Sequence, residues 1–205
     1  GHVDLCIDVH GPPWLTVPDA VRVGQELEDF DLLFYEDPVP PENMDSLKKV
    51  ADSLSLPVAA GERSSTIYGC RELVEREIVD VLQPDMGRVG GISQMKKIAV
   101  LAEAYHVPLA PHCTASNLGI AASIHAIAAV PLFLIHEFYP DNQGFNPKNI
   151  ARVDWQMDKD GYIALPPGPG LGVEIDEAKL IEESAKPQSY RWPGSKLPDG
   201  SISDY

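Results

Sequence analysis

Six short apolar runs, each ending in an ionisable residue, recur along this chain at intervals of 23 to 28 residues. Read in order, DLCID, DLLFYE, LPVAAGE, IVDVLQPD, VPLAPH and LFLIHE end at Asp8, Glu36, Glu62, Asp85, His112 and Glu137. One strand, one helix and two loops together take about 30 residues in a βαβ unit. The spacing therefore predicts six consecutive β/α repeats.

The segments between the runs carry apolar residues at the spacing of one helix face. In 91–106, for example, Ile92, Met95, Ile98 and Ala102 recur at three- and four-residue steps. The same pattern predicts helices over 43–54, 65–78 and 117–130, and a helix over 19–30 that follows a proline-containing loop. This alternation predicts an α/β fold with a parallel sheet, and we expect a TIM-type (β/α) barrel.

The position of the ionisable residues favours an active site. A barrel of this type carries its chemistry at the carboxyl ends of its strands. In CIDVHG, residues two apart on a strand face the same way, so Asp8 and His10 are predicted to share one surface. Taken alone, this pair is also compatible with a strand end that meets water, but six such ends in the same position indicate a functional constellation.

The residue types at these ends suggest two kinds of chemistry. Three carboxylates from successive strands repel one another unless a hard cation lies between them, and Mg²⁺ prefers such oxygen ligands. His10 and His112 are four strands apart and would face each other across a barrel, which places one candidate acid or base on each side of a substrate. Asp85 precedes His112 by one strand and is placed to accept a proton from its ring, while Glu137 lies close to where an oxyanion would develop.

Composition narrows the possible partners and compartments. The 205 residues suffice for one domain with a substantial core, and the formal net charge of −15 with no basic block argues against a nucleic-acid surface. No apolar run reaches the roughly 18 residues that a membrane span needs. The three cysteines are scattered, which suits reduced thiols, so we expect a cytoplasmic protein with no nucleic-acid or membrane partner.

Several other polar residues have structural interpretations that compete with functional ones. Asp37 follows Glu36 and is expected to point out of the barrel or to cap a loop. Arg63 is placed either to touch a substrate carboxylate or to form an ion pair beneath the pocket. Structural positions are expected for three more histidines, His106, His125 and His136.

Several segments resemble the barrel of the enolase superfamily in its mandelate-racemase-like branch. They are DVHG, EDPVPPEN, AAGER, DVLQPDMGRVGGISQMKKIA and APHCTASNLGIAASIHA. Within that branch, these segments look most like sugar-acid dehydratases of the galactonate dehydratase type. The resemblance runs from about residue 3 to residue 177, and it implies that Asp8, Glu36 and Glu62 are Mg²⁺ ligands.

The resemblance also implies a role for each remaining residue. His112, paired with Asp85, would remove the proton α to the substrate carboxylate, and His10 would donate a proton to the departing β-hydroxyl. Glu137 would stabilise the enediolate intermediate by hydrogen bonding. The implied reaction is Mg²⁺-dependent dehydration of an aldonic acid, a small-molecule sugar acid, to a 2-keto-3-deoxy acid. A racemase or epimerase of the same branch is the near alternative.

Members of this family carry a capping domain and two further β/α units before the strand that corresponds to the one ending at Asp8. We therefore expect residues 1–177 to form an incomplete barrel, strands 3 to 8 of the family barrel, and residues 178–205 to form an irregular tail. A homo-oligomer is expected for the full-length form. A third possibility is a non-catalytic barrel fragment that needs its N-terminal half.

Overall fold

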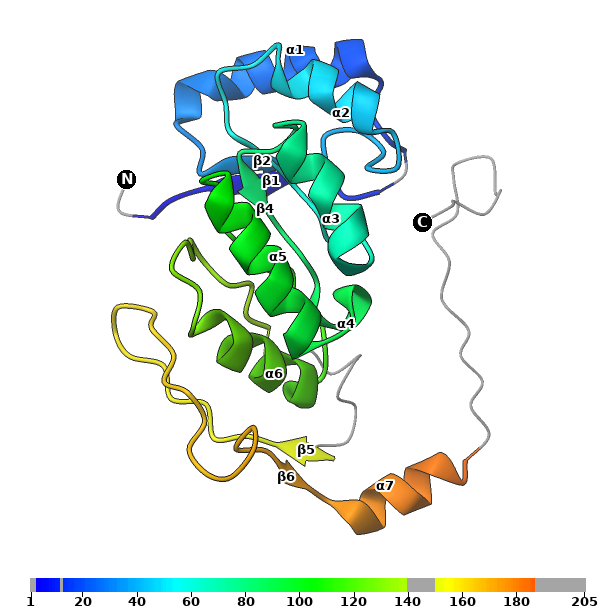
Figure 1. Ribbon diagram of the computed structural model, residues 1–205, viewed down its shortest axis with the longest axis vertical. Coiled ribbons are helices and arrows are strands. Elements are labelled where there is room, and N and C mark those ends of the chain that lie inside the picture. Colours follow the sequence, from blue (N-terminus) through cyan, green and yellow to red (C-terminus); the bar gives the residue numbers. More distant parts are fainter. Residues whose placement is uncertain (1–2, 12, 140–149, 187–205) are drawn as a thin grey trace.

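The computed structural model describes residues 3–11, 13–139 and 150–186, and its central element is a parallel sheet (Figure 1). Its four strands pair in chain order and are β1 (Cys6–Asp8), β2 (Phe34–Glu36), β3 (Val58–Ala60) and β4 (Val81–Leu82). Parallel bridges from Leu82 to Leu109 and from Leu109 to Phe133 extend this order. The predicted parallel arrangement of all six runs is thus confirmed. That the sheet belongs to an eight-stranded barrel, of which two β/α units lie elsewhere, stays a prediction.

Helices follow the strands at the positions predicted from the apolar spacing. They are α1 (Val17–Leu27), continued by the 3₁₀ turn η1 (Glu28–Phe30), then α2 (Met44–Ala51), α3 (Thr66–Glu75), α5 (Ile92–Ala104) and α6 (Asn117–Ile127). Side chains at the first turn fix where two of them begin: Thr16 accepts a hydrogen bond from the Asp19 amide, and Asn43 accepts one from the Ser46 amide. The one-turn helix α4 (Met86–Val89) was not predicted.

The sheet has two faces with different neighbours. Strand residues that point to one face share a core with the helices; they are Val58, Ala60, Leu82 and Leu109. The other alternation forms a smaller apolar cluster of Phe34, Ala59, Val81 and Ala110. Figure 1 shows the helices following one another along one side of the sheet, with α3 packed on α5 and α5 on α6. The face of the second cluster, which we call the inner face, points away from the helices.

The chain beyond residue 150 differs in part from the prediction. Strands β5 (Ala151–Arg152) and β6 (Glu174–Ile175) pair antiparallel, and helix α7 (Glu177–Ser184) lies where an irregular tail was expected from residue 178. The helix forms because Asp176 accepts a hydrogen bond from the Lys179 amide at its first turn, and because few helix breakers interrupt EAKLIEES. Residues 187–205 lie outside the described residues. Within the described part, no helix is both long and apolar enough to cross a membrane.

Candidate active site

The first two carboxylates lie side by side at the carboxyl ends of neighbouring strands. Asp8 and Glu36 are register partners of β1 and β2, and Glu36 is in turn the partner of Ala59 on β3. Partners in register point to the same face of a sheet. Since Ala59 belongs to the inner face, both carboxylates lie on that face, away from the helices.

Glu62 reaches the same region through a glycine. Strict alternation from Ala59 would direct residue 62 toward the helices, but Gly61 leaves the extended conformation with φ +138. A Cβ at Gly61 would also lie 3.0 Å from the backbone nitrogen of Gln83, which is too close. Both the positive φ and the close backbone contact favour glycine here, and the turn redirects Glu62 toward the histidine of a distant strand.

Asp85 and His112 form the predicted hydrogen bond. The Nδ1 atom of His112 lies 2.7 Å from Oδ2 of Asp85, and both residues are buried. The other Asp85 oxygen accepts the Arg88 amide at 2.8 Å and so begins α4. Because an ionised carboxylate only accepts, Nδ1 carries a proton, and in the neutral imidazole the Nε2 lone pair then faces the site.

Charge around this pair shifts both pKa values. Burial lowers the pKa of His112, but the hydrogen bond to Asp85 and the charges of Glu62 and Glu137 outweigh burial and raise it above its usual value. Burial raises the pKa of Asp85, but the hydrogen bonds from His112 and the Arg88 amide bring it below its usual value. The carboxylate is held ionised beside an imidazole of increased basicity, as a general base requires.

The Nε2 atom of His112 faces two carboxylates. Oε2 of Glu62 lies 3.3 Å away and Oε2 of Glu137 lies 3.9 Å away. The Cys113 amide donates a hydrogen bond of 2.6 Å to that Glu137 oxygen, which fixes the Glu137 side chain beside the imidazole. Atoms from three strand ends therefore meet at the Nε2 atom.

His10 approaches the Glu62 carboxylate from the β1 end of the sheet. Its Nδ1 lies 3.2 Å from Oδ2 of Asp8 and 3.9 Å from Oε2 of Glu62. The predicted proximity to Asp8 is confirmed, but the reason given for it was wrong: β1 ends at Asp8, and His10 lies past the strand with φ +40. Both histidines approach one oxygen of Glu62, although their strands are separated by three others.

The chemistry of Asp8, Glu36 and Glu62 fits a divalent cation. Burial, followed by the charges of Asp8 and Glu62, raises the pKa of Glu36 to about 7. The hydrogen bond from Gln83 lowers this pKa but does not outweigh them. Burial also raises the pKa of Asp8, in spite of the His10 charge. Among residues 3–11, 13–139 and 150–186, no three His, Cys, Asp or Glu side chains already form a metal-binding group. Carboxylates that repel one another in this way are drawn together by a cation.

Gln83 is a site residue that the sequence interpretation missed. Its Nε2 donates a hydrogen bond of 2.7 Å to Oε2 of Glu36. A signal was available, since Gln83 lies two residues before Asp85 and shares the inner-face alternation of Val81. This amide fixes one oxygen of Glu36, as residues behind metal ligands commonly do.

Asp37 narrows another expectation. It does not cap a loop: it is 1% exposed, and within the described residues neither of its carboxylate oxygens has a hydrogen-bond partner. Burial, together with the charges of Glu62, Glu36 and Asp8, raises its pKa to about 8 in spite of Arg63. A left-handed φ of +39 turns the backbone at this residue, so strand alternation does not predict its direction.

Two further histidines make structural contacts away from the site. His136 is part-buried, with Nε2 at 2.8 Å from the Ser123 hydroxyl, and Nε2 of His125 lies 3.3 Å from the Leu171 carbonyl oxygen. Burial lowers the pKa of His136 to about 4, against a small opposing contribution from the backbone of Glu137. His106 is exposed beyond the end of α5.

His136→Gln is expected to reduce the acid sensitivity of the fold. Below pH 6.5 the unfolded chain binds a proton at His136, whereas the folded chain does not until about pH 4. Folding stability from this group is thus present above pH 6.5 and is lost as the pH falls toward 4, by about 2–3 kcal/mol at pH 4.5. Urea unfolding of the parent and variant at pH 7.5 and 4.5 measures the difference. An equal pH dependence in both proteins, or the same change in His106→Gln, would contradict the prediction.

The parallel strands, the outer helices and the acid–base groups at the carboxyl ends define a domain of the β/α-barrel type. The chain belongs to the family described as Enolase C-terminal domain-like, which matches residues 1–179. The resemblance to the enolase superfamily is confirmed.

Relatives support this placement within the superfamily. The chain is 38% identical to D-xylonate dehydratase of Haloferax volcanii over 184 residues, 87% of this chain and 43% of that protein. It is 35% identical to D-galactonate dehydratase of Ralstonia pickettii, over 99% of this chain and 54% of that protein. A solved mandelate racemase/muconate lactonizing enzyme-like protein from Rubrobacter xylanophilus is 37% identical with a TM-score of 0.78, covering 89% of this chain and 46% of that one. The chain thus spans about half the length of the proteins it matches.

Proposed function

We propose that this chain carries the acid–base and metal-binding groups of a sugar-acid dehydratase, which converts an aldonic acid to a 2-keto-3-deoxy acid. The observation that carries the proposal is the Asp85–His112 pair, in which Nε2 of His112 faces Glu62 and Glu137. The names of the relatives, D-xylonate and D-galactonate dehydratase, support the substrate class.

In this proposal the residues divide one elimination between two faces of the substrate. His112 takes the proton from the carbon α to the carboxylate, the C–H electrons form a C=C bond, and an enediolate results. Glu137, when it carries a proton, stabilises the enediolate by donating a hydrogen bond to it. The carboxylate C=O bond then re-forms, the electrons of the first C=C bond form a new one between the α- and β-carbons, and the C–O bond to the β-hydroxyl breaks as His10 gives that hydroxyl a proton and water leaves. The enol product becomes the keto acid. Asp8, Glu36 and Glu62 would hold Mg²⁺, whose charge when bound offsets the negative charge that develops at the carboxylate end.

Keto-acid formation from an aldonic acid, dependent on Mg²⁺, is the expected result for the complete gene product. D-galactonate and D-xylonate head the panel of substrates, and a colour assay for 2-keto acids is the measurement. A chelator should abolish the activity, and added Mg²⁺ should restore it, because three carboxylates without a cation cannot offset the developing charge. No keto acid from any aldonic acid would refute the dehydratase assignment. Solvent deuterium at the α-carbon with a changed configuration, and no keto acid, would identify a racemase or epimerase instead.

A second candidate rests on the apolar residues at the two ends of the sheet. Val3 and Leu5 are exposed beside β1, and Phe133, Leu134 and Ile135 are exposed at the last paired segment. Exposed apolar strand edges are places where further strands pair. This favours a domain that becomes active only with an N-terminal half, and co-expression with such a half would then be needed for turnover. That the full-length protein forms a homo-oligomer and that it is cytoplasmic both stay predictions.

A further inference from the structure

The carboxylate of Glu62 has two oxygens in different surroundings. Oε2 faces the two histidines, at 3.3 Å from Nε2 of His112 and 3.9 Å from Nδ1 of His10. Oε1 faces the next residue in the chain, with Nε of Arg63 at 3.4 Å. That distance corresponds to an ion pair and not to a well-aligned hydrogen bond. The orientation of Glu62 toward the histidines is therefore coupled to the position of one guanidinium.

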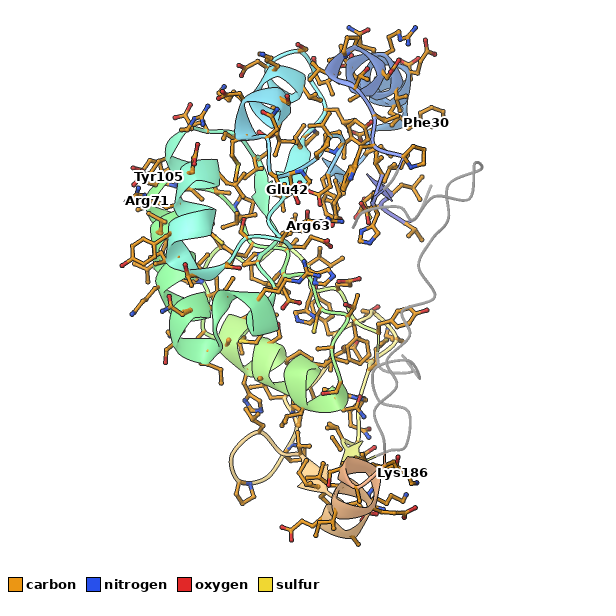
Figure 2. The ribbon with its side chains drawn as sticks, turned by 90° about the vertical axis from the view of Figure 1, so that its right-hand side faces the viewer. Phe30, Glu42, Arg63, Arg71, Tyr105 and Lys186 are labelled. Carbon is orange, nitrogen blue, oxygen red and sulfur yellow. The ribbon has the colours of Figure 1, made fainter. Side chains whose placement is uncertain are left out.

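Arg63 is in turn held by two loops from neighbouring strand ends. Its guanidinium lies over the ring of Trp14, with Cζ at 5.0 Å from the ring centroid, and Trp14 follows β1. Its Nη1 lies 3.9 Å from Oε1 of Glu42, in the loop before α2. Figure 2 shows Arg63 and Glu42 close together near the middle of the molecule. The flat guanidinium can stack on the ring and form an ion pair at once, whereas an ammonium group has no flat face to stack.

The burial of Arg63 makes direct binding of substrate by this side chain less favourable. The side chain is 14% exposed. The cavity that it borders, about 320 Å³, lies between the loops after β2 and β3 and is also lined by Gly69 and Leu73 of α3. Leu73 belongs to the core shared with the helices, so this cavity lies on the opposite side of the sheet from the inner face.

We propose that Arg63 is a positioning residue, held by Trp14, which keeps one oxygen of Glu62 directed at the two histidines and at the cation site. The inference rests on the proposed function, because it assigns Glu62 to the metal site. It predicts that loss of the guanidinium weakens metal binding and leaves the affinity for the substrate nearly unchanged.

Arg63→Met in the complete gene product is expected to weaken Mg²⁺ binding by about 10–100-fold, the usual effect of removing a residue behind a metal ligand. Isothermal titration with MgCl₂ alone measures this without any turnover. At limiting Mg²⁺ kcat should fall, saturating Mg²⁺ should restore much of it, and the KM for the sugar acid should stay near the parent value. Arg63→Lys keeps the charge but not the flat stacking surface, so its Mg²⁺ affinity should lie between those of the parent and Arg63→Met.

A second variant and a control make the test specific. Trp14→Leu should weaken Mg²⁺ binding in the same direction, and the double variant should be no worse than Arg63→Met, because both act through one guanidinium. Arg71→Met is the matched control, since Arg71 is 56% exposed on α3 and pairs with Glu75. Its Mg²⁺ affinity should equal that of the parent.

Three results would overturn the inference in distinguishable ways. Unchanged Mg²⁺ affinity with a raised KM would make Arg63 a substrate-binding residue, and unchanged Mg²⁺ affinity and KM would leave it no role at the site. Absence of Mg²⁺ binding by the parent protein would overturn the metal site and this inference together. Parent protein that binds Mg²⁺ but turns over no aldonic acid would refute the dehydratase assignment alone, while the comparison of Mg²⁺ affinities would still decide the role of Arg63.

Discussion

Asp85→Asn is expected to lower kcat for dehydration by about 10²–10⁴-fold, the range that general acid–base catalysis contributes. Asp85 accepts the Nδ1 proton of His112 at 2.7 Å, which leaves the Nε2 lone pair facing Glu62 and Glu137. An Asn side chain can present its NH₂ group to Nδ1 instead. The ring would then carry its proton on Nε2, where a base is needed.

The pH dependence of the same variant distinguishes loss of the hydrogen bond from general damage. The hydrogen bond to Asp85 raises the pKa of His112, so its loss should lower that pKa. Since the base acts when unprotonated, the acid limb of the kcat profile should move to lower pH while the plateau falls. Asp80→Asn is the control, because Asp80 precedes β4 and accepts the Val58 amide at 2.8 Å, away from the dyad. A profile in Asp85→Asn that matches the parent would count against the dyad.

His10→Asn should block keto-acid formation by a comparable factor while proton exchange at the α-carbon continues. His112 alone removes the α-proton in the proposed mechanism, so deuterium from solvent should still enter the substrate. His10, beside Asp8 at the other end of the sheet, supplies the proton that turns the β-hydroxyl into water. Without that proton the C–O bond does not break at a useful rate, and the general acid contributes about 10²–10⁴-fold.

A substrate with fluoride in place of the β-hydroxyl completes this test. Fluoride leaves without protonation, so His10→Asn should eliminate it at a rate near that of the parent protein. His106→Asn is the control, because His106 is exposed just after α5, and this change should leave every step intact. Loss of both exchange and fluoride elimination in His10→Asn would make His10 a base or a binding residue, and the dehydratase assignment would lose its main support.

The order of the strands and the positions of the helices could be predicted because each depends on local patterns. Buried strands need apolar runs, helices on a sheet need an apolar face, and both signals survive in a single sequence. The same reasoning led to the Asp85–His112 hydrogen bond, because both residues end adjacent strands. Local capping also explains α7, and the Asp176 signal at its start was overlooked.

The contacts that position the site could not be predicted in the same way. The stack of Arg63 on Trp14 joins loops that are far apart in the sequence, and nothing in either loop indicates the other. The position of His10 was wrongly explained, because strand alternation ends where φ becomes positive. Gly61 also leaves the strand conformation before Glu62, with φ +138, and strict alternation would have directed Glu62 to the helix side.

Left-handed backbone at three successive strand ends has a consequence for how such a protein evolves. His10 and Asp37 adopt φ values of +40 and +39, which cost free energy for any side chain but would be relaxed in glycine. Glycine at these two positions would also remove an imidazole from the site and a buried carboxylate that has no hydrogen-bond partner among the described residues. Selection for thermal resistance alone should therefore accept glycine at both positions, whereas selection for turnover should reject it at His10. A library screened in parallel for heat tolerance and for activity should diverge first at His10, before any position in the helical layer.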